Sequence, residues 1–363
     1  MLCLVRMALW QHDDDGGLLA ADADWHAIRQ LSEKQTVWPL VATALLHWAD
    51  VKGIDLPEDV ESACMQGRYN VVYQNTQVNE VVAEVQEVMQ QAGITPILLK
   101  GQGTARLYPH PELRTPGDID MYLGGQAQRA ADLLRPHIGD AFYNDKSPKH
   151  IQLDWKGVEI ELHKFAVNRD DTPTARFMEP WTEAELRADN SRQVQIGDAT
   201  VCVPSPMVEL VFCFYHLWIH LMMGGIGLRQ LCDWAMIVHH CHQVIDAQEL
   251  ENILRQASLL RAWHVLGRFL TDLLGLPAGE MPLYSSRHTL ASRITARLIL
   301  DSGRFGQLDR KEYAMQYEPG LRRKWHMLFF TLRLHLRALV VSPRAANILY
   351  GRYYRKRVPH LFD

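Results

Sequence analysis

The stretch Ile97–Leu123, ILLKGQGTARLYPHPELRTPGDIDMYL, contains the features that decide the fold of this chain. An apolar run stops at Lys100-Gly101, and sixteen positions after Gly101 begins the sequence GDID, which carries Asp118 and Asp120. Two acidic residues separated by one apolar residue and followed by further apolar residues are typical of a strand, where residues i and i+2 share a face about 6.5–7 Å apart. We therefore predict that Asp118 and Asp120 lie on one face of a strand while Ile119 faces the core.

Two carboxylates directed at one point repel each other unless a cation lies between them. Oxygen ligands suit Mg²⁺, which also takes substrate phosphates as partners, so the pair indicates metal-assisted phosphoryl or nucleotidyl transfer. A third carboxylate is expected from a neighbouring strand, and the segment Val158–Lys164 (VEIELHK) offers one. Its apolar residues alternate with Glu159, Glu161 and His163, and this alternation alone leaves both glutamates as candidates.

The glycine turn after the first strand is the predicted phosphate contact. A turn that ends a strand and opens a helix presents backbone N–H groups to phosphate oxygens, and Lys100-Gly101-Gln102 is placed for this role. For Lys100, two roles are alternatives: contact with phosphate, or that of an ordinary lysine at the end of a strand. For Arg114, contact with phosphate competes with pairing to Glu112 or to an aspartate.

The order of these motifs resembles that of a known family. It consists of an apolar strand ending in Lys-Gly, then Leu-Tyr-Pro-x-Pro, then Arg-x-x-Gly-Asp-Ile-Asp, and finally Ile-Glu-Leu-His. This order resembles the uncharacterised nucleotidyltransferase family within the DNA polymerase β-type superfamily, from the helices before Ile94 to at least Asp233. The matching positions are Leu99, Lys100, Gly101, Leu107, Tyr108, Pro109, Arg114, Gly117, Asp118, Asp120, Glu161 and His163.

The resemblance implies a Mg²⁺-dependent enzyme that moves an NMP from an NTP to an acceptor hydroxyl, with two metal ions in its site. It also implies that Asp118 and Asp120 bind the metal and that Glu161 is the third carboxylate. The superfamily more often has Gly-Ser after its first strand, where this chain has Gly101-Gln102. The resemblance identifies neither the NTP nor the acceptor, and a non-catalytic nucleotide-binding protein of the same fold is the alternative.

Hydrophobic periodicity predicts an α+β fold with a small mixed sheet between helical regions. Valines recur at helical spacing over Thr76–Gln90, and short strands follow over 95–99 and Asp118–Leu123. The segments His150–Trp155 and Val158–Lys164 predict a hairpin that turns at two residues, Lys156 and Gly157. We divide the chain into an N-terminal helical region (1–93), a nucleotidyltransferase core (94–203) and a C-terminal helical region (204–363).

Composition excludes several classes of protein. The chain has 363 residues, of which 47% are hydrophobic and 22% charged, as in an ordinary globular protein. A formal net charge of −4 gives no strong signal for nucleic acid. The six cysteines form no CxxC pair, which favours reduced thiols. We see no signal peptide and no uncharged apolar run near the roughly 18 residues of a membrane span, so we expect a cytoplasmic protein.

Two pairs of residues four positions apart have functional alternatives. His216 and His220 have the spacing of a zinc-binding pair, but Leu217 stands where the HExxH motif has glutamate. Packed or capping histidines are therefore favoured over a zinc hydrolase. For Arg229 and Asp233, an intrahelical ion pair competes with a cleft-facing Arg229 that binds the acceptor.

The C-terminal part of the chain is basic. Residues 301–363 contain 13 Lys/Arg against 5 Asp/Glu, a balance of +8, so the remaining residues sum to −12. Within this part, Trp325–Val341 is both apolar and basic. A helix lying on a membrane surface is one interpretation. A helix packed on the protein with Arg333 and Arg337 exposed is the favoured one.

Overall fold

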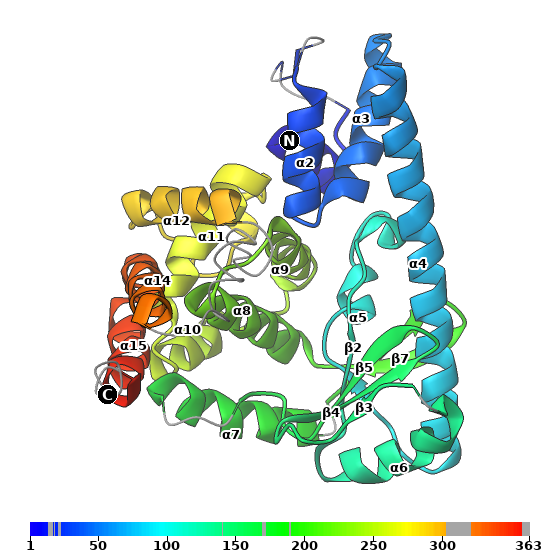
Figure 1. Cartoon of the computed structure of the whole chain (residues 1–363), viewed down its shortest axis with the longest axis vertical. Coiled ribbons are helices and arrows are strands. Elements are labelled where there is room, and N and C mark those ends of the chain that lie inside the picture. The colour runs from blue at the N-terminus through cyan, green and yellow to red at the C-terminus, as the bar shows by residue number, and fades with distance from the viewer. Residues whose placement is uncertain are drawn as a thin grey trace. The chain divides into compact units, whose positions relative to one another are not determined.

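The computed structural model describes residues 1–13, 17, 19–20, 23–139, 141–168, 172–188, 190–302 and 321–357. Within these residues the protein is α+β, with a seven-stranded mixed sheet and helices before and after it, so the predicted fold class is confirmed (Figure 1). Contacts divide the chain into two compact units. The first comprises 1–32, 37–170 and 178–213, and the second comprises 33–36, 171–177 and 214–363. The three-region division at 93 and 203 stays a prediction.

The first unit opens with helices α1 (Leu2–Trp10), α2 (Trp25–Lys34), α3 (Trp38–Lys52) and the long α4 (Glu58–Gln91). The valines Val78, Val81, Val82 and Val85 of α4 all belong to the apolar core under the sheet, as their helical spacing predicts. The helix ends at the predicted place, because Gly93 adopts a left-handed φ of 71°.

The sheet has the strand order β3-β4-β5-β2-β1-β7-β6. Its strands are β1 (Ile97–Leu98), β2 (Ile119–Tyr122), β3 (Tyr143–Asn144), β4 (His150–Trp155), β5 (Val158–His163), β6 (Arg192–Ile196) and β7 (Ala199–Val203). The central strand β2 pairs antiparallel with β1 and parallel with β5. The hairpin of β4 and β5 turns at Lys156-Gly157 as predicted.

Short elements and two further helices connect these strands. They are α5 (Gln102–Ala105), the 3₁₀ turns η1 (Pro111–Leu113) and η2 (Gly124–Gln126), α6 (Ala127–Ile138) and α7 (Pro173–Arg187). Helices α4 and α6 pack on one face of the sheet (Figure 1), and the core there includes Ile119, Met121, Ile160 and Leu162. Because side chains alternate along a strand, the residues between these point to the opposite face.

An ionic network around the buried Glu209 attaches Arg106, at the end of α5, to the start of α8 (Pro206–Met223) and to β6. The two terminal oxygens of Glu209 each lie 3.1 Å from Nη2 of Arg106, and Nη2 of Arg192 donates to the same carboxylate. Glu209 is 5% exposed, and burial raises its pKa although two guanidinium groups lie beside it. The network therefore fixes the helix that follows the Lys100-Gly101 turn.

Replacing Glu209 with alanine should lower the free energy of unfolding by roughly 1.5–3 kcal/mol, because the half-buried Arg106 and Arg192 lose the carboxylate to which they donate. The expected result is measured by urea denaturation of the purified chain. The double variant Glu209→Ala/Arg106→Met should recover part of the loss, since it removes one of the two guanidinium groups that the Glu209 carboxylate neutralises. Equal stability of both variants would show that Arg106 does not depend on Glu209.

The second unit is helical in its described residues. Its helices are the later part of α8, α9 (Leu228–Cys241), α10 (Ala247–Gln256), α11 (Leu260–Leu274), the 3₁₀ turn η3 (Ala278–Glu280), α12 (Thr289–Ser302), α14 (Leu321–Val341) and α15 (Pro343–Arg357). Three buried aromatic rings, Phe214, Trp234 and Trp263, pack with centroids 4.9–5.0 Å apart at its centre. These contacts join α8, α9 and α11 into one core.

Helix α8 is long and apolar enough to cross a membrane, judged by its length of 18 residues and mean hydropathy of 1.4. The expectation that no apolar run approaches this length needs correction here, because α8 meets it although the helix carries Glu209, His216 and His220. Because 56% of the helix is buried inside the protein, it has the character of a core helix. The length and hydropathy of this one helix are weak evidence for a membrane span.

Helix α14 contains the apolar and basic stretch noted in the sequence. Its buried residues include Leu334, Ala338 and Val341, which indicates packing on the protein. Arg333 is exposed as expected, whereas Arg337 is half-buried. Among the side chains of this helix that the structure describes, the large apolar ones that are exposed are Trp325, Phe329, Leu332 and Leu336.

Candidate active site

The sheet register brings the predicted acidic residues together. Asp120 of β2 lies opposite Glu161 of β5 in the parallel pair, and Tyr122 lies opposite His163. Asp118 immediately precedes β2. The side chains of Asp118, Asp120 and Glu161 alternate with core residues, so they share the face that α4 and α6 leave uncovered.

Asp118, Asp120 and Glu161 form a tight group, here called the carboxylate cluster. One oxygen from each lies within 4.8 Å of the other two. The Asp120 side chain is 1% exposed, Glu161 14% and Asp118 39%. The charge of Asp120 raises the pKa of Asp118, and burial adds to this effect. The cluster therefore concentrates negative charge where water screens it poorly.

Lys100 supplies one compensating charge. Because β1 is the neighbour of β2, the end of β1 places Nζ of Lys100 3.0 Å from Oδ2 of Asp120 and 3.9 Å from Oδ2 of Asp118. Burial lowers the pKa of Lys100, but the two aspartates outweigh burial and leave that pKa raised. The lysine is thus an ammonium held against the carboxylate cluster.

His163 joins two members of the cluster. Its Nε2 lies 2.9 Å from Oδ1 of Asp120 and 3.1 Å from Oε2 of Glu161, and its Nδ1 lies 3.3 Å from the carbonyl oxygen of Phe165. Burial lowers the pKa of His163, but the hydrogen bonds to Asp120 and Glu161 outweigh it and leave that pKa raised. For Glu161, burial raises the pKa, but the hydrogen bond from His163 together with the charges of His163 and His150 outweighs burial and leaves that pKa lowered.

The carboxylate cluster fits a divalent cation. Oxygens on opposite sides of a Mg²⁺ ion are separated by about 4 Å, so oxygens within 4.8 Å need only small side-chain adjustments to share one. Its donors are all carboxylate oxygens, which Mg²⁺ prefers. The ammonium of Lys100 already shows that the site attracts positive charge.

The two glutamates of β5 differ in surroundings. Glu161 belongs to the carboxylate cluster. Among the described residues, Glu159 belongs to no group of three side chains with the spacing of metal ligands. Glu159 is exposed and its Oε1 accepts a hydrogen bond of 3.0 Å from Gln152. The register thus separates two residues that alternation along the strand leaves equivalent, and metal binding by Glu161 stays a prediction.

The predicted triphosphate residues have distinct positions. Gly101 adopts a φ of +69°, and a Cβ there would lie 3.3 Å from the carbonyl oxygen of Asp118, so glycine suits this turn. The Gln102 side chain points to α4, where its Nε2 donates to Asn75 at 3.2 Å and to Asn79 at 2.5 Å. A phosphate contact from Gln102 would therefore use its backbone N–H.

Arg114 is buried rather than presented to solvent. It is 4% exposed, and its Nη1 donates to the carbonyl oxygen of Thr115 at 3.3 Å. Its own carbonyl oxygen accepts from Asn75 at 2.9 Å, which ties the GDID segment to α4. Its role at phosphate stays a prediction.

Three residues that were not predicted from the sequence lie beside the carboxylate cluster, namely His150, Lys149 and Gln152. His150 lies opposite His163 in the hairpin, with its Nδ1 3.3 Å from Oε2 of Glu161. Lys149 precedes β4, where burial lowers its pKa although Asp120 and Glu161 lie close enough to act against that shift. The two-residue turn at Lys156-Gly157 fixes the register of β4 and β5. This turn is therefore the sequence signal that predicts the pairing of His150 with His163.

The alternative histidine site receives no support from the geometry. His216 and His220 pack edge to face with ring centroids 4.4 Å apart. Among the described residues, neither histidine belongs to a group of three His, Cys, Asp or Glu with metal-ligand spacing. Arg229 is 9% exposed on α9, in the second unit, and its backbone N–H donates to Gln35 at 3.4 Å. Its acceptor-binding role stays a prediction.

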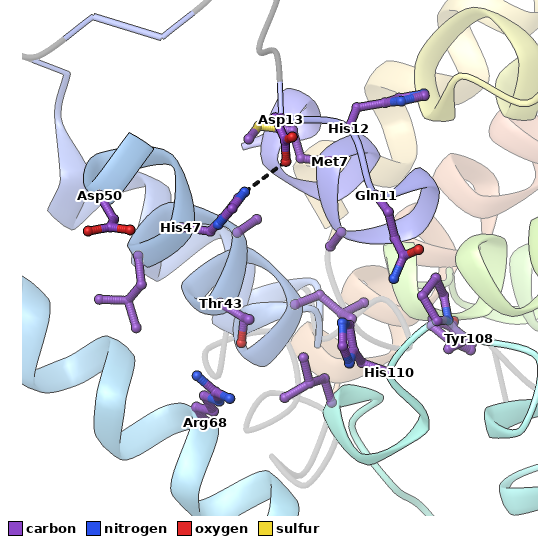
Figure 2. A pocket seen from close by; sticks show the side chains of 16 residues that line it. Met7, Gln11, His12, Asp13, Thr43, His47, Asp50, Arg68, Tyr108 and His110 are labelled. Atoms are coloured by element: carbon purple, nitrogen blue, oxygen red, sulfur yellow. Dashed lines mark hydrogen bonds and ion pairs between the residues drawn. The ribbon is translucent and has the colours of Figure 1, made fainter. Parts of the chain in front are cut away.

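A separate pocket of about 460 Å³ lies within the first unit (Figure 2). Residues of α1, α3 and α4 line it together with the segment from Tyr108 to Leu113. Two of its lining residues contact each other, with Nε2 of His47 2.8 Å from Oδ1 of Asp13. Its size is within the range of small-molecule sites. As far as the described residues show, its lining shares no residue with the carboxylate cluster.

The family model for "Uncharacterised nucleotidyltransferase" matches residues 21–275. The matched segment includes the whole sheet, the carboxylate cluster and Arg229. The chain therefore belongs to this family of uncharacterised nucleotidyltransferases, as the order of its motifs predicted. Neither a curated protein nor a solved structure is detectably similar to the chain. Family membership supports a general nucleotidyltransferase role.

Proposed function

We propose that this protein is a Mg²⁺-dependent nucleotidyltransferase that moves an NMP from an NTP to an acceptor hydroxyl. The observation that carries the proposal is the convergence of Asp118, Asp120 and Glu161 within 4.8 Å on one face of the sheet. In a family of nucleotidyltransferases, such a cluster is the natural place for the metal ions that the reaction needs.

Asp118 and Asp120 would hold both metal ions, and Glu161 would hold the one near the acceptor oxygen. Bound Mg²⁺ would neutralise the triphosphate and favour ionisation of the acceptor hydroxyl. His163 keeps Asp120 and Glu161 oriented, since one imidazole nitrogen contacts both. Because Asp120 is almost fully buried, water would compete little with its carboxylate for the metal ion.

Lys100 is the proposed phosphate ligand, with Gly101 and Gln102 as main-chain donors and Arg114 as a further nucleotide contact. The ammonium of Lys100 lies against Asp120. When metal ions neutralise the carboxylates instead, the Lys100 side chain can turn to the triphosphate. Arg229 is the proposed acceptor-binding residue. A non-catalytic nucleotide-binding protein with this fold is the competing proposal.

The deciding experiment is incubation of the full chain with Mg²⁺ and each of the four radiolabelled NTPs, with water and a panel of hydroxyl compounds as acceptors. Mg²⁺-dependent release of pyrophosphate is the expected result. Mg²⁺-dependent binding of an NTP without any release of pyrophosphate across the panel would favour the non-catalytic protein.

Replacing Lys100 with alanine should weaken triphosphate binding more than monophosphate binding. One charge-assisted contact is worth roughly 1.5–3 kcal/mol, or about one to two decades of affinity for ATP. Calorimetry with ATP and AMP in the presence of Mg²⁺ measures both. The exposed Lys156→Ala is the matched control, since Lys156 pairs with Glu84 at the hairpin turn. Equal losses for ATP and AMP would remove Lys100 from the phosphate site.

A further inference from the structure

A second group of potential metal ligands overlaps the carboxylate cluster. His150, Glu161 and His163, here called the imidazole cluster, each offer one ligand atom, and these three atoms lie within 4.8 Å of one another. Oε2 of Glu161 lies 3.1 Å from Nε2 of His163 and 3.3 Å from Nδ1 of His150. Only Glu161 belongs to both clusters.

The donor chemistry of the two clusters differs. The carboxylate cluster offers oxygen alone, whereas the imidazole cluster offers two ring nitrogens and one oxygen. Two histidines and one glutamate are ligands that Zn²⁺ and related d-block cations prefer over Mg²⁺. Ligand atoms about 2.0–2.1 Å from a tetrahedral ion lie about 3.3 Å apart, which agrees with the two separations from Glu161.

The backbone holds these ligands in place before any metal arrives. His150 and His163 are cross-strand partners in β4 and β5, and their rings meet edge to face at 5.3 Å. Gln152, the partner of Glu161, donates to Oε1 of Glu161 at 3.1 Å. The other oxygen, Oε2, is thereby directed to the two imidazoles.

The second nitrogen of His163 also has a partner that suits a metal ligand. The carbonyl oxygen of Phe165 lies 3.3 Å from Nδ1. A neutral His163 that donates from Nδ1 to this carbonyl presents the lone pair of Nε2 to the cluster. A carbonyl that orients the ring in this way is a common partner of metal-bound histidine.

We propose that His150, Glu161 and His163 form a second metal site, selective for Zn²⁺ or a similar d-block cation, beside the oxygen site for Mg²⁺. The two sites compete, because Nε2 of His163 cannot both ligate a metal and hydrogen-bond Asp120, and because Glu161 belongs to both. Occupation of the imidazole cluster therefore inhibits nucleotidyl transfer. The inhibition rests on the proposed function, whereas Zn²⁺ binding does not.

The test is calorimetric titration of the metal-free full chain with Zn²⁺ alone and, separately, with Mg²⁺ alone. His150→Ala should weaken Zn²⁺ binding at least tenfold and leave Mg²⁺ binding unchanged. Asp118→Asn should weaken Mg²⁺ binding and leave Zn²⁺ binding unchanged, since Asp118 lies outside the imidazole cluster. His137→Ala, at an exposed position of α6, is the control for general loss of a histidine.

The visible absorption of bound Co²⁺ distinguishes a His150 that ligates the metal from a His150 that only supports the fold. A site with two imidazoles and low coordination number produces intense visible absorption, whereas an octahedral oxygen site absorbs weakly. The wild-type protein and Asp118→Asn should show the intense band, and His150→Ala should not. His150→Gln, which keeps a polar side chain, covers the case in which the alanine variant fails to fold.

Three outcomes would overturn the proposal: no Zn²⁺ binding by the wild-type protein, binding that His150→Ala leaves intact, or binding that Asp118→Asn abolishes. The last would mean that Zn²⁺ enters the oxygen site. None of these depends on turnover, so failure to detect nucleotidyl transfer would contradict the proposed function while leaving the second site supported.

Discussion

Replacement of Asp118 and Asp120 together by asparagine is expected to abolish nucleotidyl transfer and leave the fold intact. The asparagine amide keeps the shape of the side chain but removes the charge that would hold the metal ions. Loss of a single preorganised electrostatic contact costs about 10²–10³-fold in rate, so loss of both carboxylates should exceed about 1000-fold. Pyrophosphate release under saturating NTP and Mg²⁺ measures the effect.

The single variants should have opposite effects on the stability of the metal-free protein. The pKa of Asp118 is raised in the folded state, first by the charge of Asp120, so its ionised form weakens folding at neutral pH. That penalty is absent below the unfolded pKa and develops as the pH rises through the folded pKa. Asp118→Asn should therefore raise the melting temperature at pH 7 in the presence of a chelator.

Asp120→Asn should lower the melting temperature under the same conditions. Its carboxylate is buried and lies within 3.0 Å of both Lys100 and His163, so its removal leaves the Lys100 ammonium and the His163 imidazole without their nearest partner. Substantial turnover by the double variant would refute the metal assignment. Melting temperatures that move in the same direction for both single variants would contradict the charge distribution described here.

Glu161→Gln is expected to lower turnover by about 100-fold or more while changing NTP binding little. The reason is that Glu161 would hold the metal ion beside the acceptor oxygen, whereas Asp118 and Asp120 would also hold the one that accompanies the triphosphate. Single-turnover kinetics and equilibrium binding of a non-hydrolysable NTP analogue separate the two effects.

Glu159→Gln is the matched control, because it removes one carboxylate from the same face of the same strand. Both glutamates accept a hydrogen bond from Gln152, so the variants disturb that contact alike. Turnover of Glu159→Gln should remain within about threefold of the wild-type value, since an exposed glutamate outside the cluster contributes little. A larger loss for Glu159→Gln than for Glu161→Gln would contradict the assignment of the third carboxylate.

Several features of the site follow from the sequence by itself. The alternation of acidic and apolar residues around Ile119 places Asp118 and Asp120 on one face, because successive side chains of a strand point in opposite directions. The Lys156-Gly157 turn fixes the register of β4 and β5, because a two-residue hairpin loop admits one pairing. Each of these is a property of consecutive residues, so no distant contact is needed to predict it.

Other features were decided by the tertiary structure. The choice of Glu161 over Glu159 depends on the parallel pairing of β2 with β5, which places Glu161 beside Asp120. The engagement of Gln102 by Asn75 and Asn79 depends on where α4 passes the turn after β1. Which strands adjoin, and which helix covers them, is set by how the apolar faces of distant segments are buried together, and local periodicity does not contain that information.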